Sequence, residues 1–240
     1  MIRAVVFDID DTLVDFSGAT GRGLLAHLAT TAPVSTADTD RYLALWRHLE
    51  RIHFNAYLRG EYSFTEQRRR RAREFCATAG FPLGPEEAEV DAWVSRYLAH
   101  CDRAFVLFPD VLPALDTLDC AELRLAAMSN SDRAYQDRKL TALGIRHRME
   151  TLVCCDDVGG VAKPDPRIFH AVCDRLGIAP AEAVYVGDRL DSDARAAIAA
   201  GLTGVWLDRT GNGHADVPII TTLDELGRVL PARTVRKGAR

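Results

Sequence analysis

Residues 3–13 have the sequence Arg-Ala-Val-Val-Phe-Asp-Ile-Asp-Asp-Thr-Leu, an apolar run that passes directly into a cluster of acids. A short run of β-branched and aromatic residues predicts a buried strand of a parallel sheet. Asp8 and Asp10 stand at its end, and alternate residues of an extended chain point to the same side. Two carboxylates at that spacing can share a metal ion or divide the roles of nucleophile and acid. The alternative is an ordinary polar strand end, because aspartate favours turns.

Strands and helices alternate in the second half of the chain. Amphipathic segments that predict helices separate the apolar runs. We expect the last helix near residues 223–230. The runs that predict strands are residues 123–128, 151–154, 183–186, 204–207 and 219–221. This alternation predicts an α/β fold with a doubly wound, mainly parallel sheet and helices on both faces.

A helical segment interrupts this pattern after the first strand. Its apolar residues recur at steps of three and four, and breakers such as Gly60 and Pro82 separate the stretches. Such stripes predict a small helix bundle. We therefore predict a core domain, an inserted helical domain and a flexible tail. Their expected bounds are residues 1–17 with 105–231 for the core, 18–104 for the insertion and 232–240 for the tail.

Composition limits the possible partners and compartments. The net charge of −4 gives no electrostatic reason to expect nucleic acid or a membrane surface as a partner. The six cysteines contain no C-x-x-C pair or zinc-site spacing, which favours buried thiols in a reducing compartment. No apolar run approaches the roughly 20 residues of a membrane helix, and the N-terminus runs straight into a strand. We expect a cytoplasmic protein, whose oligomeric state the sequence leaves open.

Polar residues follow the later predicted strands. Ligands of open α/β sheets bind beyond the carboxyl ends of the strands. Each residue also has an ordinary explanation, such as a helix cap, a surface lysine or an acid near a helix N-terminus. More acids than one cap requires, however, favour a cation site of oxygen ligands. These residues are Ser129, Asn130, Lys163, Asp188, Asp191 and Asp193. Their convergence on the edge that carries Asp8 and Asp10 predicts a functional site.

Together these segments resemble the haloacid dehalogenase (HAD) superfamily. Residues 8–12, Asp-Ile-Asp-Asp-Thr, look like its first motif, D-x-D-x-T. Ser129 is similar to the hydroxyl residue of the second motif, and Lys163 before a proline is similar to the third. Asp188 and Asp193 resemble the fourth, G-D-x-x-x-x-D. The order fits over nearly the whole chain, and the inserted helices resemble the helical C1 cap of the superfamily.

The resemblance implies a magnesium-dependent phosphomonoester hydrolase that works through an aspartyl-phosphate. Asp8 would be the nucleophile, while Asp10 would protonate the leaving oxygen and then activate water. Mg²⁺ would be bound by Asp8, the main-chain carbonyl of Asp10, and Asp188, with Asp193 orienting the site. The phosphate would be bound by Ser129, Asn130 and Lys163. Dehalogenases of the superfamily lack an acid at the place of Asp10, so Asp10 favours phosphoryl chemistry.

The inserted helices give a first indication of the substrate. They resemble the caps of house-cleaning nucleotidases and N-acylneuraminate-9-phosphatases at Trp46, residues 57–60, Glu66 and the following arginines. This implies a small phosphorylated metabolite, first a nucleoside monophosphate and second a sugar phosphate or phosphoglycolate. From the residues themselves, we expect Trp46 in the core and the arginines of residues 68–73 on a solvated helical face.

Other functions stay open at this stage. A phosphomutase of the same fold would carry the same core motifs. A phospho-accepting signalling module would also have an acidic pocket and a lysine, but at about half this length. A binding protein that kept only the fold would not need the complete set of charged residues.

Overall fold

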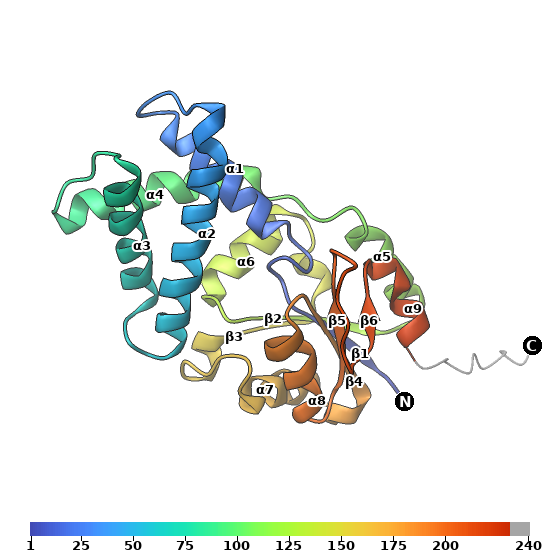
Figure 1. Ribbon diagram of the computed structural model, residues 1–240. Helices are drawn as coiled ribbons and strands as arrows, with labels where there is room; N and C mark the ends of the chain where they lie inside the picture. Colours follow the sequence, from blue (N-terminus) through green and yellow to red (C-terminus); the bar gives the residue numbers. More distant parts are fainter. Residues whose placement is uncertain (231–240) are drawn as a thin grey trace, which may run out of the picture. The chain divides into compact units, whose positions relative to one another are not determined.

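The computed structural model describes residues 1–230 and divides into two compact units. The core unit comprises Met1–Asp15 and the chain from Val106 onward, and the helical unit is Phe16–Phe105. Figure 1 follows the chain through both of them. The predicted tail at residues 232–240 lies outside the described residues. The role of the helical unit as a cap remains a prediction.

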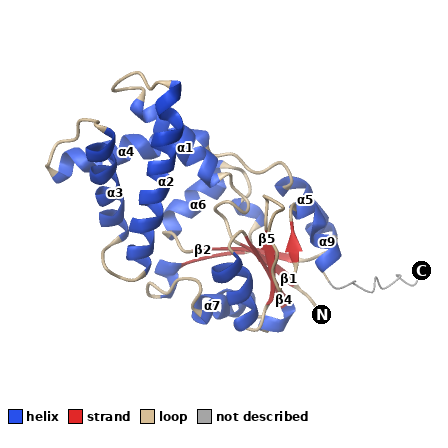
Figure 2. Ribbon diagram, viewed as in Figure 1, coloured by secondary structure: helices blue, strands red, loops and turns tan. Residues whose placement is uncertain are grey.

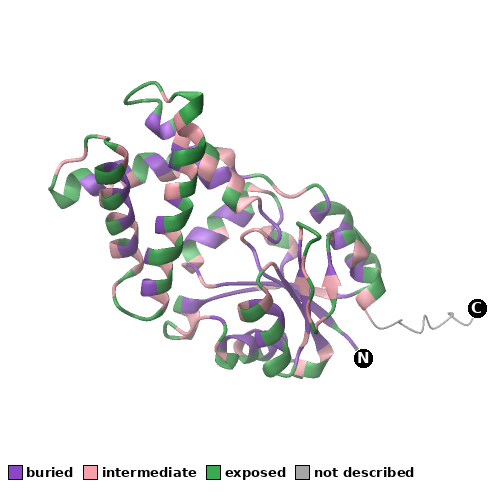
Figure 3. Ribbon diagram, viewed as in Figure 1, coloured by how far each residue is buried: buried purple, intermediate pink, exposed green. Residues whose placement is uncertain are grey.

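The core unit is built on a six-stranded sheet in the order β3-β2-β1-β4-β5-β6, in which every neighbouring pair is parallel. The predicted α/β fold class is therefore confirmed. The strands are almost entirely buried (Figure 3). They are β1 (Ala4–Phe7), β2 (Arg124–Ser129), β3 (Thr151–Cys154), β4 (Ala183–Gly187), β5 (Thr203–Leu207) and β6 (Ile219–Ile220).

Strand register brings the motif residues to one edge of the sheet. Phe7 of β1 stands opposite Ala127 of β2 and Val186 of β4. The residues that follow these strands therefore emerge at nearly the same level. The chain also changes direction across the sheet at the pair β1 and β4, which is where ligands bind in open α/β sheets.

Helices cover the sheet of the core unit. α7 and α8 lie together on one face in Figure 1, and their apolar residues join alternate strand residues such as Val6 and Tyr185 in one core cluster. α7 begins at Pro166, where the Asp165 side chain caps the helix, and ends at Leu176, just before Gly177 in the left-handed region. The helices are α5 (Val111–Cys120), α6 (Arg133–Ala142), α7 (Pro166–Leu176), α8 (Ala196–Ala199) and α9 (Leu226–Val229).

The helical unit consists of helices joined by loops (Figure 2). Ser35 and Ser63 cap the second and third helices with their side chains. Gly23 allows the close contact of the first and fourth, because a Cβ atom there would lie 2.6 Å from the Cys101 sulfur. The helices are α1 (Phe16–Leu28), α2 (Thr36–Leu58), α3 (Phe64–Ala79) and α4 (Glu87–Ala104). Within residues 1–230, none has both the length and the apolar composition of a membrane-spanning helix.

One arginine of the predicted solvated face is buried. Arg71 is 5% exposed, and its guanidinium bonds to Glu50 and lies 4.5 Å from the ring of Trp46. The expectation of a solvated face is wrong at this position, because Arg71 shares the inner face of α3 with Phe75, four residues on. Trp46 is in the core, as expected, and donates a hydrogen bond to the Tyr97 hydroxyl at 3.0 Å.

The helical segment that follows β4 is irregular. Leu190–Arg195 form a wide π-type turn, and only Ala196–Ala199 continue as α8. Within this turn the Asp193 carboxylate points inward and accepts a hydrogen bond from the Arg189 backbone N–H at 2.9 Å. π-type turns often occur at functional sites.

Candidate active site

Lys163 links the first and fourth motifs at the sheet edge. Its ammonium donates to Asp8 Oδ1, to Asp193 Oδ1 at 2.7 Å and to Tyr185 Oη at 2.8 Å. An ammonium has three N–H donors, so all of them are used. Lys163 is 5% exposed and Asp8 6%. The amine is therefore held in one place beside the Asp8 carboxylate.

Electrostatics at this edge are dominated by burial. Burial raises the pKa of Asp8 to about 7 against the opposing effect of Lys163. Burial likewise raises the pKa of Asp188 to about 8, and the nearby carboxylates of Asp8 and Asp193 add to the shift. Burial alone would lower the pKa of Lys163, but Asp193 and Asp8 outweigh it and raise that pKa. The site thus holds more negative charge than one lysine compensates.

The second motif fixes the loop that carries Lys163. Asn130, at the end of β2, donates from Nδ2 to the Lys163 carbonyl at 2.9 Å and accepts from the Lys163 backbone N–H at 2.6 Å. Its side chain therefore orients Lys163, and phosphate binding by Asn130 remains a prediction. Ser129 is 4% exposed, and its hydroxyl oxygen accepts from the Ser131 backbone N–H at 3.2 Å.

Asp10 has partners that sequence reasoning missed. Gln136 Nε2 donates to Asp10 Oδ2 at 2.7 Å, and Lys139 Nζ donates to Asp10 Oδ1 at 2.5 Å. Both come from α6, the helix that follows Ser129. The available signal was a glutamine and a lysine three residues apart in the first helix after the second motif. Tyr185 was missed as well, because a tyrosine within an apolar strand looks like a core residue.

The acids at this edge fit a divalent cation. Carboxylate oxygens of Asp8, Asp188 and Asp193 all lie within 4.8 Å of one another. Hard cations such as Mg²⁺ prefer oxygen ligands of this kind. Asp193 already accepts hydrogen bonds from the Lys163 ammonium and from the Arg189 backbone N–H, which agrees with a role in orienting the site. Arg189 is exposed, and the group that bonds to Asp193 is its backbone N–H.

Comparison with known proteins decides the family. The family model for haloacid dehalogenase-like hydrolases matches residues 2–201. This chain belongs to that family. The prediction of a HAD-type enzyme is therefore confirmed.

Two relatives of this HAD hydrolase bear phosphatase names. Glyceraldehyde 3-phosphate phosphatase of Methanopyrus kandleri is 33% identical over 222 residues, which cover 87% of this chain and 85% of the relative. N-acylneuraminate-9-phosphatase of Mus musculus is 30% identical over 217 residues, with 88% and 84% covered. Among solved structures, the magnesium-bound HAD hydrolase YfnB of Bacillus subtilis matches with a TM-score of 0.77 at 20% identity, covering 96% of this chain and 99% of that one. That last likeness shows the fold.

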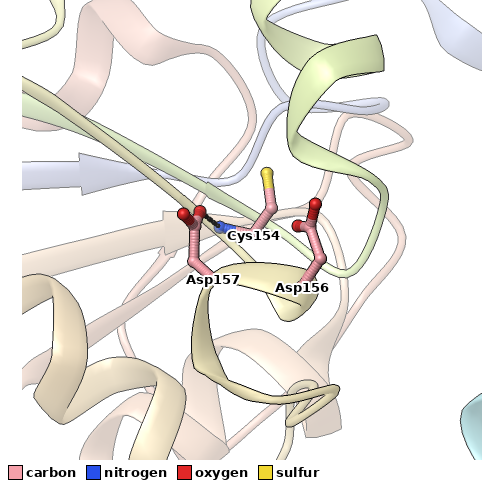
Figure 4. Close-up of side chains that lie close together, drawn as sticks. All are labelled: Cys154, Asp156 and Asp157. Carbon is pink, nitrogen blue, oxygen red and sulfur yellow. Dashed lines mark hydrogen bonds between the residues drawn. The ribbon is translucent and has the colours of Figure 1, made fainter.

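The HAD core also contains a second group of possible metal ligands, formed by Cys154 at the end of β3 and by Asp156 and Asp157 just after it (Figure 4). Its carboxylates already have partners. Asp157 accepts from the Cys154 backbone N–H at 2.9 Å and pairs with Arg133 at 3.1 Å. Asp156 accepts from the backbone N–H of Arg133 at 3.1 Å. These contacts tie β3 to the start of α6, and they explain the group without a metal ion.

Proposed function

We propose that this protein is a magnesium-dependent phosphomonoester hydrolase that acts through an aspartyl-phosphate on Asp8. The observation that carries the proposal is the buried arrangement of Asp8, Lys163 and Asp193 beside Asp10 and Asp188. It combines a carboxylate nucleophile, a fixed cation and a second carboxyl group at one edge of the sheet. The phosphatase names of the relatives support the same reaction class.

The first step would transfer the phosphoryl group to the protein. The Asp8 carboxylate attacks phosphorus while the bond to the leaving oxygen breaks, and Asp10 gives its proton to that oxygen. Lys163 offsets the repulsion between the carboxylate and the phosphate, and the Ser129 hydroxyl donates to a phosphate oxygen. Mg²⁺, held by Asp8, the Asp10 carbonyl and Asp188, would supply further stabilisation of the negative charge on the phosphoryl group.

The second step would release phosphate. Asp10, now ionised, takes a proton from water as the water attacks phosphorus, and the bond from phosphorus to the Asp8 oxygen breaks. Asp10 thereby regains its proton, and Asp8 becomes a free carboxylate again. A dehalogenase needs no protonated leaving oxygen, so the second carboxyl group favours phosphate esters as substrates.

We place small sugar phosphates first among the substrates. The named relatives act on glyceraldehyde 3-phosphate and an N-acylneuraminate 9-phosphate. Trp46, the aromatic residue that suggested a nucleotide, is 1% exposed and packs against Phe75 and Tyr97, so it offers no open ring for a base. Nucleoside monophosphates become the second candidate. We also keep a cytoplasmic location as part of the proposal.

The test is phosphate release from p-nitrophenyl phosphate and from a panel of sugar phosphates, phosphoglycolate and nucleoside monophosphates. Each assay is run with Mg²⁺, with EDTA and with Asp8→Asn. Asp191→Asn is the matched control, because Asp191 is exposed and pairs with Arg195. We expect Mg²⁺-dependent release that Asp8→Asn abolishes and the control retains, with sugar phosphates preferred. Release that survives Asp8→Asn would contradict the proposal, and phosphoryl return to a sugar bisphosphate would indicate a mutase.

A further inference from the structure

The Asp10 carboxylate is held at both oxygens by one face of α6. Lys139 donates to Oδ1 at 2.5 Å and Gln136 donates to Oδ2 at 2.7 Å. Residues three apart in a helix lie on the same face, so α6 presents the two donors side by side. One donor on each oxygen fixes both the position and the plane of the carboxylate.

Burial of the two donors indicates that their role is to hold the Asp10 carboxylate by hydrogen bonds. The Lys139 side chain is 2% exposed, although lysine is almost never buried unless it is paired. Gln136 is fully buried, and within the described residues its Oε1 has no hydrogen-bond partner. A buried polar atom without a partner is costly. This amide is nevertheless held with its N–H₂ group toward Asp10.

Gln136 also connects Asp10 to the second motif. Its Nε2 donates to Ser129 Oγ at 3.1 Å as well as to Asp10. A continuous chain of contacts therefore runs from Lys139 through Asp10 and Gln136 to Ser129. Movement of α6 or loss of either donor would change the angle between the acid and the phosphate-binding hydroxyl.

We propose that Gln136 and Lys139 are positioning residues that orient the Asp10 carboxyl group for proton transfer to the leaving oxygen. This inference rests on the proposed phosphatase reaction. Neither side chain is the nucleophile or a phosphate-binding group, although Gln136 also donates to the phosphate-binding Ser129. Their loss should therefore slow phosphoryl transfer most for esters whose leaving group needs a proton, and least for esters whose leaving group does not.

The test compares phenyl phosphate, whose leaving group needs a proton, with 2,4-dinitrophenyl phosphate, whose leaving group does not. In Lys139→Met and Gln136→Leu we expect kcat/KM for phenyl phosphate to fall by about 100-fold, the lower range for general acid catalysis. For the dinitrophenyl ester we expect a fall of less than about threefold in Lys139→Met. In Gln136→Leu we expect a somewhat larger fall with this ester, because that variant also loses the bond to Ser129. Arg138→Met is the matched control, since Arg138 is exposed on the same helix and lies 6.0 Å from the Tyr135 ring.

A double mutant separates positioning from a general structural effect. In an Asp10→Asn background, Lys139→Met should cause no further loss with phenyl phosphate, because the group it orients is already absent. Equal losses with both esters, additive losses in the double mutant, or a phenyl phosphate rate as fast as in the wild type would overturn the inference. If Lys139→Met fails to fold, Gln136→Leu carries the comparison, with a loss for phenyl phosphate that exceeds its loss for the dinitrophenyl ester. A wild-type protein inactive on both esters with Mg²⁺ would instead contradict the proposed function itself.

Discussion

At the scale of single residues, the site depends on how a buried lysine is kept in place. Lys163 is surrounded by Asp8, Asp193 and Tyr185, and its backbone is clamped by Asn130. A buried charge that loses a partner is strongly destabilised, whereas one with all its donors satisfied is held rigidly. The tyrosine is the neutral member of this set and can be removed without changing the charge of the site.

We therefore predict that Tyr185→Phe lowers kcat about tenfold with little change in KM, because a hydrogen bond to a charged group contributes about 1.5–3 kcal/mol. Steady-state kinetics on the preferred ester measures this. Tyr97→Phe is the control, since this buried hydroxyl accepts from Trp46 in the helical unit. It should lower the melting temperature and leave kcat unchanged. Equal kcat values for Tyr185→Phe and the wild type would show that the hydroxyl does not orient Lys163.

At the scale of elements, the wide turn at Leu190–Arg195 determines where the fourth motif lies. It directs the Asp193 carboxylate back against the end of β4, at Gly187. A Cβ atom on Gly187 would lie 2.5 Å from Asp193 Cγ, too close for any side chain without movement of the acid. Glycine is required there by the close approach of the two segments.

Gly187→Ala should therefore displace Asp193, destabilise the protein by about 1–3 kcal/mol and remove most activity. Denaturant unfolding and phosphate release measure the two effects. Gly227→Ala is the matched control, because a Cβ atom there has no neighbour within 4 Å and the position lies inside α9. It should be neutral or stabilise by up to about 1 kcal/mol. A fully active Gly187→Ala variant would mean that Asp193 tolerates displacement.

The elements also show what sequence reasoning can and cannot reach. The strand expected at residues 151–154 agrees with β3 residue for residue. A short apolar run between breakers is too short for a helix and fits a buried strand. The prediction of a solvated helical face was wrong at Arg71, because counting charged residues does not show which face of the helix each residue occupies. Gln136 and Lys139 were missed for a similar reason. Which face of α6 meets Asp10 depends on tertiary packing, which no local pattern encodes.

At the scale of the whole molecule, stability should depend on pH through a buried histidine that lies outside the four motifs. His27 in α1 is 2% exposed, and neither of its ring nitrogens has a hydrogen-bond partner among the described residues. Burial, followed by the nearby Arg96 and His100, lowers the pKa of His27 to about 4 from an ordinary value of 6.5. The folded protein thus keeps this imidazole neutral where the unfolded chain protonates it.

The free energy of unfolding should fall as the pH drops from 6.5 towards 4, because the unfolded chain binds a proton that the folded state excludes. For a single proton the loss is at most about 1.4 kcal/mol per pH unit, and it is complete below the folded pKa. Urea unfolding at several pH values measures it. His27→Leu should flatten the curve in this window, while the exposed His147→Gln should not. An unchanged slope in His27→Leu would contradict this account.

The central claim concerns the covalent role of Asp8, and the most direct measurement is an acid quench during turnover of a phosphate ester with Mg²⁺. Digestion and mass spectrometry then locate any phosphoryl group. We predict that the peptide containing Asp8 carries it, and that Asp10→Asn increases its amount by slowing the attack of water. The mechanism would be contradicted if the wild type and Asp10→Asn both turned over without a trapped phosphoryl group and activity also survived Asp8→Asn.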